Sequence, residues 1–358
     1  MFTFALNVLQ DSKGIQNHLP TLQTLNITFS DAERIFCLNE DEMIGQQVSL
    51  RLEKLKLKFL PQMTYIWVGP NNSLTLQHLT KLKIWNCGKL EVIFPKSVVR
   101  YLPELKKVTI RDCMELKQIV EEDRSNLLSI DGGSEVEEII GCDKEASKNY
   151  FAFPNLEELE IIQCDSLEVV FSKSVVRCLP KLNVLVIRKC KELREIIEGD
   201  KNLSNLVSHQ PCFPKLEALH VDDCHKLKRL FSGSVSNDLP NLHLLAINGA
   251  NELEELVGCK KGKIKVELPK LKLLIFMHLE NFSQEIELHN LKNCIVYKCP
   301  KLTLTSTTTL QKLRHDFPYE DFMNTELGIS TFRDILEGIS YKYSQVRTNQ
   351  SMNINNKK

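Results

Sequence analysis

The sequence lacks an excess of charge of either sign, because 46 lysines and arginines are balanced by 46 aspartates and glutamates over 358 residues. A formal net charge of zero gives no global attraction to nucleic acid or to an anionic membrane, so any electrostatic argument has to be local. No apolar run approaches the ~18 residues that a membrane-spanning helix requires. We therefore expect no membrane span.

The sequence also lacks the usual signs of secretion and of catalysis. Residues 1–10 have neither the basic region nor the long apolar stretch of a signal peptide, which favours a chain in the reducing cytosol. H-E-x-x-H, G-x-S-x-G and C-x-x-C are absent, and the nine histidines occur singly. We expect no enzyme, no metal and no cofactor.

What the sequence does contain is a recurring pattern, clearest between Leu156 and Val170. Taking Leu156 as offset 0, apolar or sulfur-bearing residues stand at offsets 0, 3, 5, 8, 11 and 14. Leu159 and Ile161 predict a short strand, because side chains two residues apart in a strand point to one face. The backbone must turn at offset 8, Cys164. This is one coil of a leucine-rich repeat, which cannot bury its apolar face alone.

Nine further coils carry the same pattern. Successive coils are 20–34 residues apart, except for one interval of 51. In the ten coils together, offset 0 is occupied in turn by Leu22, Leu52, Leu79, Leu105, Leu156, Leu182, Leu216, Leu242, Leu271 and Leu291. A stack of such coils is a one-dimensional solenoid. The sequence therefore predicts an α/β leucine-rich-repeat solenoid, a curved horseshoe with a parallel sheet on the concave face and an irregular or short-helical convex side.

Three regions flank or interrupt the predicted solenoid, which spans residues 22–305. Residues 1–21 are interpreted as a partial N-terminal repeat. The long interval holds an acidic insertion at residues 121–152 with nine acidic and three basic residues. Residues 306–358 form a C-terminal tail, in which apolar residues from Phe332 to Ile339 at helical spacing predict a short amphipathic helix over 330–341.

Cysteine occupies offset 8 in six of the ten coils, at Cys87, Cys113, Cys164, Cys190, Cys224 and Cys299. Successive coils bring such thiols close enough to suggest bridges. We favour a ladder of buried, reduced thiols, each acting as a small hydrophobic group with a weak donor.

Side chains at offsets 2, 4 and 6 of each coil are predicted to point to the concave face of the solenoid. We call this solvent-facing side of the sheet its outer face, and function must reside there. In coils two to four these positions form a basic block with one tryptophan: Lys54, Lys56, Lys58, Lys81, Lys83, Trp85, Lys107 and Arg111. In coils eight to ten they are mainly apolar: Leu244, Leu273, Ile275, Met277, Ile295 and Tyr297.

Each of these two sets has a plain alternative. The basic block is either a solvated face or a binding surface for an anionic partner, and like charges on neighbouring strands favour the latter because they repel. Nucleic acid is disfavoured because Trp85 is the single aromatic residue among the strand positions of the block, whereas single-strand binders repeat their stacking platforms. The apolar set is either covered by the C-terminal tail or free as a protein interface.

Several motifs together resemble a known family. They are the F-P-x-L start at Phe153–Leu156 and Phe213–Leu216, the C-x-x-L ladder, and the K-S-V-V-R-x-L-P joint at Lys96–Pro103 and Lys173–Pro180. They resemble the C-terminal leucine-rich repeats of plant nucleotide-binding disease-resistance proteins of the coiled-coil class, over roughly residues 20–305. That resemblance implies an intracellular immune receptor whose repeats bind a pathogen effector or a guarded host protein and restrain the nucleotide-binding domain. From the basic block we expect them to contact an acidic face of that domain, in cis or in trans.

The sequence departs from whole receptors of that family, because it has no phosphate-binding loop. We therefore expect a fragment or a truncated paralogue that recognises a partner but lacks the nucleotide-dependent switch. The alternative is the substrate receptor of a ubiquitin ligase, whose cysteine-containing repeats have a similar period, although residues 1–50 show no adaptor-binding helical motif.

Overall fold

The computed structural model describes residues 22–37, 48–68, 74–95, 102–121, 153–172, 179–198, 213–232, 239–258 and 265–306. All of them belong to the first of the two units into which the chain divides, Met1–Lys312. The predicted repeat at 1–21, the acidic insertion beyond Glu121 and the tail with its predicted helix at 330–341 lie outside the described residues.

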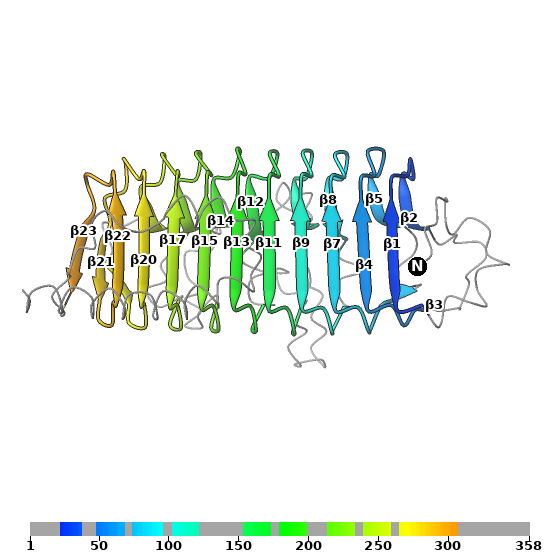
Figure 1. The fold of residues 1–358 in the computed structure, drawn as a ribbon, viewed down its shortest axis with the longest axis horizontal. Helices are drawn as coiled ribbons and strands as arrows, with labels where there is room; N and C mark the ends of the chain where they lie inside the picture. Colours follow the sequence, from blue (N-terminus) through cyan, green and yellow to red (C-terminus); the bar gives the residue numbers. More distant parts are fainter. Residues whose placement is uncertain are drawn as a thin grey trace, which may run out of the picture. The chain divides into compact units, whose positions relative to one another are not determined.

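Ten parallel strands form one long sheet, and each strand occupies offsets 2 to 6 of its coil. Figure 1 shows them side by side in chain order, from β1 in blue to β22 in orange. The predicted strands and the leucine-rich-repeat fold are thereby confirmed. The strands are β1 (Thr24–Thr28), β4 (Lys54–Lys58), β7 (Lys81–Trp85), β9 (Lys107–Arg111), β11 (Glu158–Ile162), β13 (Val184–Arg188), β15 (Ala218–Asp222), β17 (Leu244–Asn248), β20 (Leu273–Met277) and β22 (Asn293–Tyr297).

The register of the sheet is constant from one coil to the next. Leu159 on β11, for example, is paired with Val108 on β9 and with Leu185 on β13. Residues at the same offset therefore form straight rows across the sheet. The rows at offsets 3 and 5 face the interior, where Leu159, Ile161 and their equivalents are buried in one continuous apolar core. The exception is Val296 in the last coil, which is 41% exposed.

The cysteines at offset 8 lie in this core, as predicted, and form no disulfides. Five of the six are fully buried, and Cys299 in the last coil is half-buried. Each Sγ lies 3.3–3.6 Å from the carbonyl oxygen of the residue two positions earlier, within reach for a weak hydrogen bond. Burial raises the pKa of the Cys87 thiol to about 12, which keeps it protonated and unreactive.

Short parallel strands line the opposite side of the coils, where the sequence predicted irregular or short-helical structure. Most of them begin within one residue of offset 13, where buried apolar residues such as Val170 and Phe171 recur and the strand pairs with that of the next coil. They are β2 (Arg34–Cys37), β3 (Val48–Ser49), β5 (Tyr65–Val68), β6 (Leu74–Thr75), β8 (Val92–Phe94), β10 (Gln118–Val120), β12 (Val169–Ser172), β14 (Glu195–Glu198), β16 (Arg229–Ser232), β18 (Glu255–Gly258), β19 (Val266–Leu268), β21 (Glu285–Leu288) and β23 (Thr303–Ser306).

These strands pair in small groups, of which β12-β14-β16-β18 is the longest. The joints at residues 96–101 and 173–178, which belong to the convex side predicted to be irregular or short-helical, lie outside the described residues. Within the described ranges there is no helix, and so none that is long and apolar enough to cross a membrane.

Candidate protein-interaction surface

The outer face of the long sheet is built from the rows at offsets 2, 4 and 6. Because the register is constant, the row at offset 2 joins Lys54, Lys81 and Lys107, and the row at offset 4 joins Lys56 and Lys83. Neighbouring strands lie ~4.8 Å apart, so the structure brings the predicted basic residues together as one patch. We call this patch the basic block: Lys54, Lys56, Lys58, Lys81, Lys83, Lys107 and Arg111.

Two members of the basic block are neutralised by the next strand. Lys107 Nζ lies 2.5 Å from Glu158 Oε2, and Arg111 Nη2 lies 3.0 Å from Glu160 Oε1. The register of β9 and β11 places Lys107 directly opposite Glu158. Glu160 is opposite Thr109, so Arg111 reaches it diagonally, from two residues further along β9. The Glu160 side chain is only 5% exposed, so the second pair is largely removed from water.

The other five members form no ion pair with any described residue. We call them the unpaired lysines: Lys54, Lys56, Lys58, Lys81 and Lys83. Burial and then the neighbouring ammonium groups of Lys107 and Lys56 lower the pKa of Lys83. Mutual repulsion of this kind is a cost of the free protein, and an anionic partner would relieve it.

The middle of the face is polar but largely closed to solvent. Asp222 on β15 lies between Arg188, whose Nε is 3.4 Å from Oδ2, and Asn248, whose Nδ2 donates to Oδ1 at 2.8 Å. Burial raises the pKa of Asp222, although these two partners oppose the shift. This chain of partners continues from Asn248 to His278 (3.1 Å), so these partly buried polar groups have hydrogen-bond partners.

Buried His220 gives a prediction about pH. Burial, followed by the charge of Arg188, lowers the pKa of His220 to about 3. The unfolded chain then binds a proton that the folded protein excludes, so the free energy of unfolding decreases as the pH falls below the ordinary histidine value. Between about pH 7 and pH 5 we expect His220 to contribute a loss of about 2 kcal/mol.

Urea denaturation at several pH values measures this contribution. The pH dependence should become shallower by that amount in His220→Gln and stay unchanged in His225→Gln, because His225 is exposed. Equal pH slopes for the wild type and both variants would show that His220 takes up its proton in the folded protein.

The apolar set at the other end of the face was predicted to bind a partner, with coverage by the C-terminal tail as the alternative. Four of its six members are buried and therefore not accessible to a partner: Leu244, Leu273, Ile275 and Met277. They do not belong to the core inside the coils. Their rows are continuously apolar over β17 and β20, and leaving so much apolar surface in water would be unfavourable. The predicted covering helix at 330–341 lies outside the described residues.

Only the last strand keeps part of this apolar set accessible. Tyr297 is 48% exposed and Ile295 is half-buried. Tyr297 packs edge-on against His278, with ring centroids 5.4 Å apart, and Lys298 Nζ lies 5.4 Å from its ring centroid. Of the six apolar residues, these two are the ones that a partner can reach in the structure as it stands.

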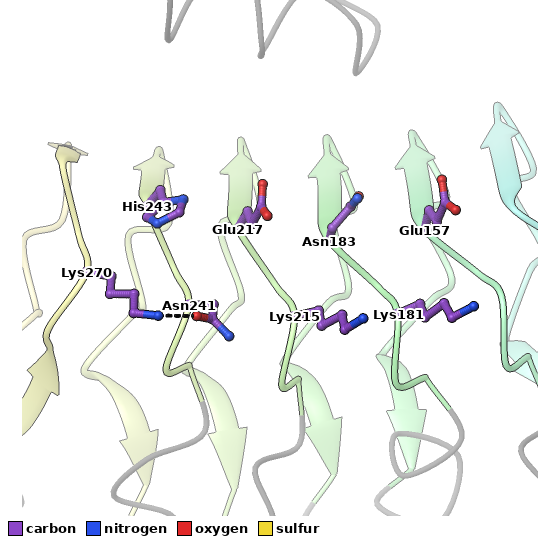
Figure 2. Close-up of a pocket in the computed structure, with 8 residues that line it drawn as sticks. All are labelled: Glu157, Lys181, Asn183, Lys215, Glu217, Asn241, His243 and Lys270. Carbon is purple, nitrogen blue, oxygen red and sulfur yellow. Dashed lines mark hydrogen bonds between the residues drawn. The ribbon is translucent and has the colours of Figure 1, made fainter.

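A shallow groove of about 370 Å³ lies where the chain enters strands β11 to β20. Figure 2 shows its two rows, with Lys181, Lys215, Asn241 and Lys270 in one, and Glu157, Asn183, Glu217 and His243 in the other. Lys270 Nζ donates to Asn241 Oδ1 at 2.7 Å. Because carboxylates and ammonium groups are mixed, the groove does not select a ligand of one charge. The described residues contain no cluster suited to a metal ion.

Sequence reasoning missed one exposed feature beside the basic block. Phe29 and Phe59, at offset 7 of the first two coils, stack on each other, and Phe59 contacts Trp85. Offset 7 was not counted among the strand positions. The available signal was the residue type, because the equivalent position is polar or glycine in the other eight coils.

Comparison with known proteins identifies the repeats. Residues 4–114 and 134–191 match a family model described as "Plant disease resistance protein RPS2-like, leucine-rich repeats". Leucine-rich repeats of this kind are protein-interaction scaffolds. A search of curated proteins found no match.

Proposed function

We propose, because the leucine-rich repeats of this chain belong to the family of those in plant disease resistance proteins, that the chain is the recognition part of an intracellular plant immune receptor. In this function it binds a pathogen effector, or a host protein that an effector has modified, in the cytoplasm. It acts by binding and carries out no chemistry of its own.

The basic block is the observation that supports this proposal most directly. Five lysines with no ion pair to a described residue stand side by side on a rigid sheet. A cationic patch attracts acidic protein surfaces and raises the association rate more than it discriminates between partners. We assign it to an acidic face, either of an effector or host partner or of a nucleotide-binding domain in cis or in trans. Tyr297, which is 48% exposed, and half-buried Ile295 are the accessible apolar contacts at the other end.

Pairwise binding assays test this function. The purified chain is titrated against a panel of pathogen effectors and against the nucleotide-binding domain of a receptor with repeats of the same family. We expect at least one partner to bind, and Lys56→Glu/Lys83→Glu to weaken binding by more than about tenfold, since close interfacial charge pairs are worth 1.5 kcal/mol or more.

Lys89→Glu/Lys228→Glu is the matched control, because it changes the net charge equally at exposed positions outside the long sheet. Binding should also weaken as salt is added. If a partner binds the wild type and Lys56→Glu/Lys83→Glu equally well, the basic block has no part in binding. If no effector, host protein or nucleotide-binding domain binds the wild type, the proposed function itself is rejected.

A further inference from the structure

Every coil turns at offset 7 with a backbone conformation that most residues avoid. In all ten coils this residue has a positive φ, between +52° and +63°. Left-handed φ suits glycine, asparagine and aspartate, and it is strained for bulky residues. Eight coils respect this preference or carry another polar residue: Asn86, Asp112, Gln163, Lys189, Asp223, Gly249, His278 and Lys298.

Phe29 and Phe59 are the exceptions. Both place a benzyl side chain on a left-handed backbone, with φ of 54° and 53°. Phe29 is also 76% exposed to water, so its ring gains little from burial. The turn does not require phenylalanine, because polar residues make the same turn in eight other coils. Phenylalanine is unfavourable at this turn in two adjacent coils, which points to a role in binding and not in stabilising the fold.

The two rings and Trp85 form a row of aromatic contacts at the carboxyl ends of the neighbouring strands β1, β4 and β7. Ring centroids of Phe29 and Phe59 are 4.6 Å apart with an interplanar angle of 4°, and those of Phe59 and Trp85 are 5.7 Å apart. Trp85 is held in place because its Nε1 donates to Asp112 Oδ2 at 2.6 Å. We call Phe29, Phe59 and Trp85 the aromatic stack.

The aromatic stack is joined to the basic block. Lys58 Nζ lies 4.9 Å from the centroid of the Trp85 ring, and Lys58 immediately precedes Phe59 in the chain. Lys54, Lys56 and Lys58 then lead away from the stack along β4, with side chains on one face. Their spacing is about 7 Å, which is two residues of an extended chain.

The stacking geometry decides between two kinds of anionic ligand. Single-stranded nucleic acids bind by laying bases on open ring faces. Here the faces of Phe29 and Phe59 are turned toward each other at contact distance, so no base fits between them. The part of the stack that stays exposed, chiefly Phe29 at 76% exposure, suits a large apolar side chain, and its ring edges carry partial positive charge that suits carbonyl and carboxylate oxygens.

We propose that the basic block and the aromatic stack together bind an extended acidic segment of another protein that carries a large apolar side chain at one end. Carboxylates at alternate positions of the segment pair with Lys54, Lys56 and Lys58 and with the lysines of β7. The apolar side chain packs on Phe29 and Phe59. This inference rests on the proposed function and specifies the chemistry of the partner.

Fluorescence anisotropy with two labelled peptides tests this inference. One peptide has glutamate and serine in alternation and ends in phenylalanine, and the other ends in alanine. We expect the phenylalanine peptide to bind about fivefold more tightly to the wild type, the worth of one aromatic contact. Phe29→Asn/Phe59→Asn should abolish that ratio, and asparagine suits the left-handed backbone, so this variant should fold.

The lysine variants separate the two halves of the surface. Lys56→Glu/Lys83→Glu should weaken both peptides by more than about tenfold and leave the phenylalanine-to-alanine ratio intact. Equal affinities of the two peptides for the wild type, or no binding of either, would overturn the proposal. If an oligouridylate of equal charge binds more tightly than the phenylalanine peptide, the ligand of this surface is a nucleic acid and not a protein segment. The peptide assay contains no immune partner, so its failure is distinguishable from failure of the proposed function.

Discussion

Replacement of Ile275 by aspartate is expected to lower the free energy of unfolding by more than about 4 kcal/mol. Ile275 is 1% exposed, and its partners in register are Ala246 on β17 and Ile295 on β22. An aspartate there has no cation opposite it on either neighbouring strand. The protein must bury an unpaired carboxylate, protonate it or expose the apolar row, and each of these outcomes destabilises the fold.

Tyr297→Asp is the matched control on the adjacent strand. Tyr297 lies in the next outward row, opposite Met277, and its side chain is 48% exposed. We expect a change within about 0.5 kcal/mol, the usual range for surface substitutions. Urea denaturation followed by circular dichroism gives both values, and a constant slope with respect to urea concentration shows that the unfolding transitions are comparable.

The pair of substitutions also decides how this end of the face takes part in binding. A large loss for Ile275→Asp alone means that Leu244, Leu273, Ile275 and Met277 stabilise the protein, and that Ile295 and Tyr297 are left for a partner. If Ile275→Asp unfolds at the same urea concentration as the wild type, the burial is incidental and all six apolar residues return to the candidate interface.

The long sheet was predictable from the sequence because its determinants are local and repeated. Leu159 and Ile161 alternate with outward residues, and a turn follows at Cys164, so each coil specifies its own strand. Stacking ten copies in constant register then requires no further information. The rows of lysines on β4 and β7 follow directly, since offset alone decides which residues are neighbours.

The burial and pairing of outward residues could not be predicted in the same way. Offset places Ile275 on the outer face but does not say what covers it. The left-handed turn at Phe29 is equally hidden, because a positive φ is a property of the closed coil and most residues at that position give no sign of it. Offsets also place β9 beside β11 across an interval of 51 residues, but they do not show that Glu160 is buried there or that Arg111 pairs with it.

That pairing gives the second large effect, at Arg111. The sequence placed Arg111 among the residues that bind a partner, but in the structure its guanidinium faces the Glu160 carboxylate, 3.0 Å away. Replacing Arg111 with methionine preserves much of the side-chain volume and leaves the carboxylate buried without its cation. We expect a loss of about 3–5 kcal/mol in the free energy of unfolding, as for other buried pairs that lose one partner.

Lys107→Met removes the neighbouring pair on the same two strands and serves as the control. The side chains of Lys107 and Glu158 are 26% and 27% exposed, against 23% and 5% for Arg111 and Glu160. Water can solvate Glu158 once its partner is gone, so the expected loss is about 1 kcal/mol or less. The two variants differ in the burial of the remaining carboxylate and not in the charge that is removed.

The double variant Arg111→Met/Glu160→Met identifies the source of the loss. Removing both charges also removes the uncompensated carboxylate. The free energy of unfolding of the double variant should therefore be within about 1 kcal/mol of the wild-type value, or higher than it. Arg111 then stabilises the boundary between the basic block and the acidic strand β11, and the five unpaired lysines carry the attraction for a partner. A stable Arg111→Met variant with weakened partner binding would instead place Arg111 in the binding surface.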